Sequence, residues 1–273
     1  MLYNMTCSGQ LHTDLSYNLA VCILASGSKG NAIFVSDGAT SILIDAGLSG
    51  IEIERRLLSK GLSPENLDAI LVSHEHADHI QGVGVLSRRF NLPVYLNRKT
   101  QQAAAAQLGN TYDLKRFECG STFQIANLTI HPFSTSHDAT DPAGFTVSYN
   151  GTKIGIATDL GMATSVVKTH LQSCVLLILE ANHDTAMLNN GPYPWPLKQR
   201  INSRLGHLSN KAAKHLLTEV QHDRLLHVVL AHLSEINNTP HKALREVSQA
   251  ITRCNAKIDV AMQDVCGELL HLK

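Results

Sequence analysis

Apolar and polar residues alternate along this chain in short blocks that predict strands and helices. Apolar runs bounded by glycine-containing turns predict strands at 19–25, 32–35, 41–44, 69–72 and 94–96. Apolar residues at helical spacing predict helices at 52–60, 80–90 and 99–108. Strands therefore open the chain, and helices follow them.

The second half of the chain shows the same order. A strand-rich stretch runs from 114 to 157 and contains the hairpin signal Asn150-Gly151. Beyond residue 162 we expect a helix, a strand at 175–179, a proline-rich loop, a helix at 210–220, a strand at 225–231 and a helix at 241–251. Two strand-rich blocks, each followed by helices, predict an α/β fold in which two sheets pack face to face with helices outside. Residues 1–18 are polar and show neither helical nor strand periodicity. We therefore expect a loose N-terminal extension ahead of a single domain at 19–273.

Five predicted strands end in a residue that can bind metal or exchange protons. These residues are Asp45, His74, Asp159, Glu180 and His232. Ligands of α/β proteins bind at the carboxyl ends of strands. Burying such groups singly would be costly, so we expect them to meet at one rim.

Composition narrows the class of protein. The 273 residues are 44% hydrophobic and 17% charged, which is ample for a core. Twenty-three basic residues balance 23 acidic ones, which excludes a globally basic surface but not a local basic patch. The longest apolar run, at 19–25, is too short to span a bilayer, and the segment before it is not basic and contains Asp14, unlike a secretory signal. Six cysteines without a C-x-x-C pair predict reduced thiols and a cytoplasmic protein.

Histidine is concentrated beside carboxylates. Of the 15 histidines, three fall in the segment 73–79, directly after a predicted strand. In extended geometry His74 and His76 point to the same side, whereas Asp78 and His79 lie where a helix begins and can face a second point. One metal ion would take the first pair and a second ion the later pair. Imidazole and carboxylate suit Zn²⁺, and also Mn²⁺ or Fe.

The string H-E-H-A-D-H at 74–79 matches the H-x-H-x-D-H signature of the metallo-β-lactamase superfamily. The strings A-S-G-S-K-G-N at 25–31, L-E-A-N-H-D at 179–184, G-H-L-S-N at 206–210 and A-H-L-S-E-I-N-N at 231–238 resemble its YycJ subgroup. The resemblance implies a four-layer αββα sandwich and a metal-dependent hydrolase, with a 5′→3′ DNA exonuclease activity suggested for the subgroup. The sequence is also similar to the transfer-RNA 3′-processing nucleases and the cyclic-phosphate phosphodiesterases.

The resemblance also implies roles for single residues. It implies that two divalent ions are bound, one by His74, His76 and His137 and the other by Asp78, His79 and His232. Asp159 would bridge the two ions, and Asp45 would orient the ligand loop by hydrogen bonds. Asp78 also counts among the implied catalytic residues.

A second implied feature is an acid–base pair. Leu179-Glu180-Ala181 resembles the H-E-A-T motif of the transfer-RNA nucleases without its leading histidine, and Gly206-His207-Leu208-Ser209 resembles their H-S-T motif. In that branch the carboxylate orients the histidine, which protonates the leaving oxygen or contacts the phosphate. A buried carboxylate would favour the imidazolium form of His207. His183 could play the same part.

The interval between Asp184 and Glu219 contains no acidic residue. We expect Lys198, Arg200 and Arg204 to bind substrate phosphates, and Lys211 and Lys214 add two further uncompensated charges. Tyr193 and Trp195 lie in the same interval and could stack bases. The alternative is a proline-stiffened surface loop followed by a solvated helix face.

These features favour a phosphodiester hydrolase, a DNA exonuclease-like nuclease that uses a metal-bridging hydroxide. A small-molecule phosphodiesterase, or a carboxylic ester or thioester hydrolase of the same fold, is the alternative. A metal-binding regulatory protein and a lactam hydrolase fit the residues less well. The expected partner is a nucleic acid or a small phosphodiester, not a membrane. Because the chain has no room for a large inserted domain, grip on a long substrate would come from loops or from a homodimer.

Overall fold

A computed structural model describes residues 17–273, which form two seven-stranded sheets packed face to face. The first sheet has the strand order β14-β1-β2-β3-β4-β5-β6. Its β1, β2 and β3 pair antiparallel, and β3 to β6 pair parallel. Its strands are β1 (Leu19–Ala25), β2 (Ala32–Ser36), β3 (Ser41–Ile44), β4 (Ala69–Leu71), β5 (Pro93–Leu96), β6 (Asp113–Arg116) and β14 (Leu270–Leu272).

The second sheet has the order β13-β12-β11-β10-β9-β8-β7. Strands β7 to β10 pair antiparallel, and β10 to β13 pair parallel. Each sheet thus joins an antiparallel half to a parallel half. The strands are β7 (Phe123–Ile125), β8 (Leu128–Ser134), β9 (Ala143–Tyr149), β10 (Thr152–Ala157), β11 (Leu176–Glu180), β12 (His227–Ala231) and β13 (Lys257–Val260).

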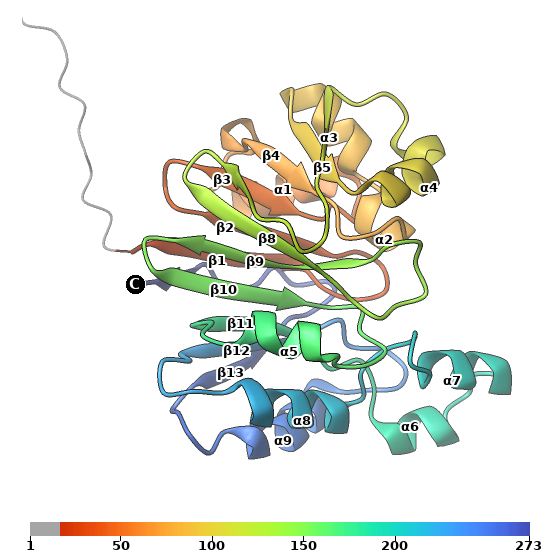
Figure 1. Ribbon diagram of the computed structural model, residues 1–273. Coiled ribbons are helices and arrows are strands. Elements are labelled where there is room, and N and C mark those ends of the chain that lie inside the picture. Colours follow the sequence, from red (N-terminus) through yellow and green to blue (C-terminus); the bar gives the residue numbers. More distant parts are fainter. Residues whose placement is uncertain (1–16) are drawn as a thin grey trace, which may run out of the picture.

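Helices cover the outer face of each sheet, so the fold has four layers (Figure 1). Helices α1 (Gly50–Ser59), α3 (Val83–Phe90) and α4 (Arg98–Leu108) lie over the first sheet, and α5 (Ser165–Leu171), α8 (Asn210–Val220) and α9 (Pro240–Val247) lie over the second. The short helix α2 (Ala77–Ile80) lies at one end of the sandwich, as do α6 (Thr185–Asn190) and α7 (Trp195–Ile201). Short 3₁₀ turns occupy Pro64–Asn66 and Ser248–Ala250.

The side-chain alternation of the strands divides the interior into three hydrophobic cores. In β1, Leu19, Val21 and Ile23 face the core between the sheets, whereas Cys22 and Leu24 face the helices. This period of two is what a strand buried on both faces requires. The other helix-side core lies between the second sheet and α5, α8 and α9. The predicted αββα sandwich is therefore confirmed.

Four details of the predicted elements are wrong. The helix predicted at 80–90 is two helices, α2 and α3, because the chain turns at Gly82, where a Cβ would lie 2.4 Å from Leu48 O. The predicted proline-rich loop contains α6 and α7, since proline is compatible with a first helical turn and Pro196 stands there in α7. The helix predicted at 241–251 ends as α9 at Val247. Strands β13 and β14 were not predicted, because segments of four and three residues are too short to show a pattern.

Of the predicted extension at 1–18, residues 1–16 lie outside the described part of the chain. Asn18 already hydrogen-bonds through its backbone N–H to Leu272 O, at 2.7 Å. Among the helices of residues 17–273, we find none with the length and apolar character that a bilayer crossing requires.

The parallel strands of both sheets carry their C-terminal ends to one rim of the sandwich. Asp45 follows β3, His74 comes shortly after β4, Asp159 follows β10, Glu180 ends β11 and His232 follows β12. Asp45, Asp159 and His232 adopt left-handed backbone conformations, with φ of 59°, 56° and 55°. Non-glycine residues rarely adopt this conformation, and it is concentrated at functional sites. The rim is therefore the candidate site.

Candidate metal centre

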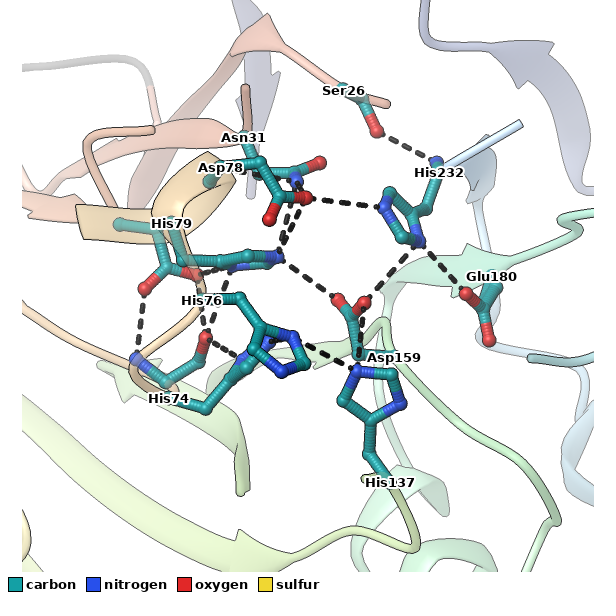
Figure 2. A network of polar contacts seen from close by, with 12 residues as sticks. Ser26, Asn31, His74, His76, Asp78, His79, His137, Asp159, Glu180 and His232 are labelled. Atoms are coloured by element: carbon teal, nitrogen blue, oxygen red, sulfur yellow. Dashed lines mark hydrogen bonds and ion pairs between the residues drawn. The ribbon is translucent and has the colours of Figure 1, made fainter. Parts of the chain in front are cut away.

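Imidazole and carboxylate groups from both sheets converge at this rim (Figure 2). The side chains come from the segment after β4, from α2, and from the segments that follow β8, β10 and β12. Side chains that are more than 150 positions apart in the sequence thus lie within a few ångströms of one another. The structure brings together all seven predicted ligands: His74, His76, Asp78, His79, His137, Asp159 and His232.

The first group consists of three imidazoles. His76 Nδ1 lies 3.0 Å from His74 Nε2 and 3.4 Å from His137 Nε2. Nitrogen ligands at 2.0–2.1 Å from a tetrahedral ion would be about 3.4 Å apart. The three nitrogens thus have the spacing of ligands to a single ion.

The second group consists of Asp78, His79 and His232. Asp78 Oδ2 lies 3.6 Å from His79 Nε2 and 3.7 Å from His232 Nε2. His79 is fully buried, and His232 is 3% exposed. A carboxylate and two imidazoles therefore surround a second candidate metal position, next to that of the first group.

Asp159 lies between the two groups. Its Oδ1 is 3.7 Å from His137 Nε2, and its Oδ2 is 3.3 Å from His79 Nε2. Figure 2 shows its carboxylate at the centre of the network. Each oxygen thus faces a histidine of a different group, as a ligand shared by two ions would require.

Oxygen atoms hold the Nδ1 atoms of four of these histidines. Asp45 Oδ2 accepts from His79 Nδ1 at 2.8 Å, and Gly206 O accepts from His137 Nδ1 at 3.1 Å. Ser73 Oγ donates to Asp45 Oδ2 at 2.8 Å, so it accepts from His74 Nδ1, at 3.0 Å. His232 Nδ1 donates to Glu180 Oε1 at 2.9 Å. With Nδ1 protonated in each ring, the lone pair of Nε2 faces the cluster, as in metal-binding histidines.

The charge of the cluster also suits cations. Burial opposes the charged form of His79, but Asp159 and Asp45 outweigh it and raise its pKa to about 9. Burial also opposes the charged form of His232, and Asp159 and Asp78 raise its pKa well above the usual value. For Asp78, burial favours the neutral acid, but His232 and His79 lower its pKa overall. The carboxylates therefore require positive charge here, which bound metal would supply in place of protons.

Two buried polar atoms also indicate that a divalent metal ion fits this site. Asp159 Oδ2 and His232 Nε2 have no hydrogen-bond partner among residues 17–273. Buried polar atoms are nearly always satisfied. These seven imidazole and carboxylate groups, in which the other nitrogen of four of the five histidines is already held, match the donor set of Zn²⁺ and similar ions.

Glu180 joins the metal cluster to His207. Glu180 is fully buried, and its Oε1 accepts hydrogen bonds from His207 Nδ1 at 2.7 Å and His232 Nδ1 at 2.9 Å. Its Oε2 accepts from the backbone N–H groups of Leu160 and Leu208, at 2.8 and 2.9 Å. Because these four bonds use its acceptor sites, Glu180 orients two histidines and does not bind an ion itself.

This pairing determines the charge of both groups. Burial alone would raise the pKa of Glu180, but His207 and its hydrogen bond lower it overall. Burial also opposes the imidazolium form of His207, and Glu180 outweighs it and raises the pKa of His207. The side chain of His207 is 21% exposed, so the ring reaches solvent.

His183 lies in a different environment. It is fully buried, both ring nitrogens lack hydrogen-bond partners within the described chain, and burial lowers its pKa to about 4. A neutral, enclosed imidazole cannot deliver a proton to a substrate at neutral pH. The geometry therefore favours His207 over His183 as the acid.

The predicted basic residues do not form one uncompensated patch. Arg200 pairs with Asp138, and Lys214 lies 3.2 Å from Glu246, so both charges are compensated. Lys198 Nζ donates to Asn189 O at 2.8 Å. Acidic partners distant in sequence explain the difference. Arg200 alone among the three predicted phosphate-binding residues lines the cavity beside His207, whereas Arg204 is exposed elsewhere.

The sequence analysis did not identify three polar residues of the site. Asn31 Nδ2 lies 3.2 Å from Asp78 Oδ2 and 3.1 Å from His79 Nε2. Ser73 connects Asp45 to His74, and Ser26 Oγ accepts from the backbone N–H of His232 at 2.7 Å. Asn31 and Ser26 belong to the string A-S-G-S-K-G-N at 25–31, whose resemblance to the YycJ subgroup was the signal that could have indicated them.

Comparison with known proteins gives one consistent result. Residues 40–232 match the β-lactamase superfamily domain. The exodeoxyribonuclease YycJ of Bacillus anthracis is 38% identical over 231 residues, which cover 84% of this chain and 88% of YycJ. The exodeoxyribonuclease WalJ of Streptococcus pneumoniae is 39% identical over 220 residues, or 79% of this chain and 82% of WalJ. The metallo-β-lactamase-fold protein YhfI from Bacillus subtilis has the same fold, with a TM-score of 0.70 and 19% identity over 92% of this chain and 99% of YhfI. This chain therefore belongs to the metallo-β-lactamase superfamily and is a relative of YycJ and WalJ within it.

Proposed function

We propose that this protein is a metal-dependent phosphodiester hydrolase that degrades DNA from an end, with residues 19–273 as its single catalytic domain. The observation that carries the proposal is the Glu180–His207 pair, which joins a solvent-reaching imidazole to the metal-type cluster. Hydrolysis of a thioester, or of an ester with a good leaving group, does not need such an acid, because a thiolate or an activated oxygen leaves without a proton.

We propose two divalent ions as cofactors. His74, His76 and His137 would hold one, Asp78, His79 and His232 the other, and Asp159 would contact both. Zn²⁺ suits these donors best, with Mn²⁺ or Fe as alternatives. When bound, such ions supply Lewis-acid stabilisation of charge on phosphate oxygens and lower the pKa of water.

The residues of the chain perform the remaining tasks. His207 donates its Nδ1 proton in a hydrogen bond to Glu180, so the Nε2 proton of the imidazolium is the one available to a substrate. As hydroxide attacks phosphorus and the bond to the leaving oxygen breaks, His207 gives this proton to that oxygen, so that the alcohol leaves and His207 becomes neutral. Glu180 holds the ring in place and stabilises its charge. Arg200 lies at the edge of the same cavity, where it can bind a phosphate oxygen.

The choice of DNA rests on the relatives. YycJ and WalJ, at 38% and 39% identity, are both named exodeoxyribonucleases. Their names support the nuclease over the small-molecule phosphodiesterase. Free thiols at Cys22, Cys119, Cys174, Cys254 and Cys266 support the cytoplasm as the compartment.

A substrate panel tests the proposal. Purified protein is loaded with Zn²⁺ or Mn²⁺ and given end-labelled single- and double-stranded DNA, RNA, bis(p-nitrophenyl) phosphate and a glutathione thioester. We expect nucleotides to be released from DNA ends, and EDTA to abolish the release. Thioester hydrolysis without phosphodiester hydrolysis would refute the proposal.

A further inference from the structure

A cavity of about 280 Å³ opens beside His207. Its lining comes from α7 and the residues before it, from the turn after β1 and from the segments after β11 and β12. The described lining residues are Tyr193, Leu197, Arg200, Ile201, Gly206 and His207, with Ser28, Asp138, Asn182 and Ser234. Of these residues, only His207 and Arg200 take part in the proposed hydrolysis.

The residues that line this cavity are of two chemical kinds. Tyr193, Leu197 and Ile201 supply an aromatic ring and two aliphatic side chains, all half-buried. Arg200 and His207 supply guanidinium and imidazole N–H groups, and Asp138 holds Arg200 by an ion pair. Apolar side chains suit a flat ring, and these N–H donors suit a phosphate.

The other aromatic residue of this loop is oriented differently. Trp195 is 66% exposed and is not part of the cavity lining, although it lies two residues from Tyr193. The two aromatics, equivalent in the sequence pattern, are thus distinct in the structure, and Tyr193 is the one positioned to meet a ligand bound beside His207.

The size of the cavity limits what it can hold. Cavities for drug-sized ligands range from about 300 to 1,000 Å³, so this one matches a single nucleotide unit and not a longer segment of strand. Its position next to the proposed acid means that the unit it holds would be adjacent to the bond that breaks.

We propose that this cavity holds the terminal nucleoside of a DNA strand, with its base stacked on Tyr193. This inference rests on the proposed function and adds to it the site that selects an end. A base within a continuous strand carries neighbours on both sides, and a single-unit cavity does not accommodate them.

Nucleotide binding gives a test that does not require turnover. Trp195, the single tryptophan, lies close to Tyr193 and can report ligand binding by its fluorescence. We expect deoxyadenosine monophosphate to bind metal-free protein more tightly than 2-deoxyribose 5-phosphate does. Loss of one base–aromatic stack corresponds to about 5- to 150-fold in Kd. Tyr193→Ala should remove this preference and Tyr193→Phe should keep it, while Tyr112→Ala, at a tyrosine that is 60% exposed and outside the cavity, should leave it unchanged.

Hydrolysis of paired substrates separates this inference from the proposed function. The wild-type protein should release an intact terminal nucleotide with kcat/KM about 5- to 150-fold above that for an end whose last base is missing. Tyr193→Ala should cleave the two ends equally. If Tyr193→Ala still distinguishes them, and nucleotide binding is unchanged by the substitution, the cavity proposal is wrong. If the wild-type protein binds the nucleotide with the predicted preference but cleaves no DNA, the cavity proposal stands and the proposed function fails.

Discussion

Replacing His207 with alanine removes the proposed proton donor without touching a metal-facing nitrogen. The side chain bonds only to Glu180 in the described structure, through Nδ1 at 2.7 Å. His232 retains its own bond to Glu180 Oε1, at 2.9 Å. The metal content of His207→Ala should therefore equal that of the wild-type protein.

The size of the effect follows from the leaving group. A deoxyribose alkoxide is a poor leaving group, and a positioned general acid contributes about 10²- to 10⁴-fold, or about 2.7–5.4 kcal/mol of barrier. Nitrophenolate leaves without a proton. His207→Ala should thus depress kcat/KM for DNA by about 10²- to 10⁴-fold and that for bis(p-nitrophenyl) phosphate far less.

Glu180→Gln should behave differently from His207→Ala. Because Glu180 holds both His207 and His232, its substitution weakens the acid and also loosens a proposed metal ligand. Loss of such a partner lowers metal affinity by about 10- to 100-fold. We therefore expect slow DNA cleavage that added metal restores only in part.

The assay compares both substrates at saturating metal, with metal content measured in parallel. His241→Ala is a matched control, because this histidine is exposed on α9, outside the site. Equal losses on both substrates would show that His207 binds or supports the site and does not act as an acid. Loss of metal in His207→Ala would show that His207 is a ligand.

Three further variants test other parts of the account. Asp159→Ala should lose bound metal and most activity while the circular dichroism spectrum is unchanged, and full metal content would contradict its proposed position between the ions. A triple variant replaces Lys198, Arg200 and Arg204 by Gln and should bind DNA more weakly. The plot of log K against log salt concentration should become less steep by about 0.7–0.9 for each phosphate that the protein no longer neutralises. An unchanged slope would show that these three residues do not contact phosphates. Hydrogen bonds from two arginines lower the pKa of Glu52 to about 2. Its ion pairs therefore stabilise the fold above the usual pKa of 4.5 and cease to do so as pH falls toward 2. Glu52→Gln should lower the free energy of unfolding by about 1–2 kcal/mol at pH 7 and less at pH 3, as measured with urea, and a pH-independent difference would contradict this.

The sequence was sufficient to predict the sandwich and the convergence at its rim. Each relevant strand is a buried apolar run that ends in an acid or a histidine, and parallel pairing carries such ends to one edge. Strand direction thus places Asp45 and His74 at the edge of the first sheet and Asp159, Glu180 and His232 at the edge of the second, and the face-to-face packing of the two sheets brings these edges together. The proposed roles of these residues remain for experiment.

Contacts between distant segments could not be predicted in the same way. The pairing of Arg200 with Asp138 depends on how the loop after β8 meets α7, and no local pattern encodes it. The shared use of Glu180 by His207 and His232 depends on the register that sets Glu180 beside Ala231. Asn31 reaches Asp78 because the turn after β1 folds back on α2. These are tertiary contacts, and single-residue patterns carry no information on them.

The most direct test of the central claim is a metal titration of the metal-free protein, followed by DNA release from a labelled end. We predict that activity rises with added Mn²⁺ or Zn²⁺ and saturates near two bound ions per chain, since two groups of ligands share Asp159. Saturation at one ion per chain would contradict the two-ion centre. Release of nucleotides that continues in the metal-free protein would contradict the proposed hydrolase altogether.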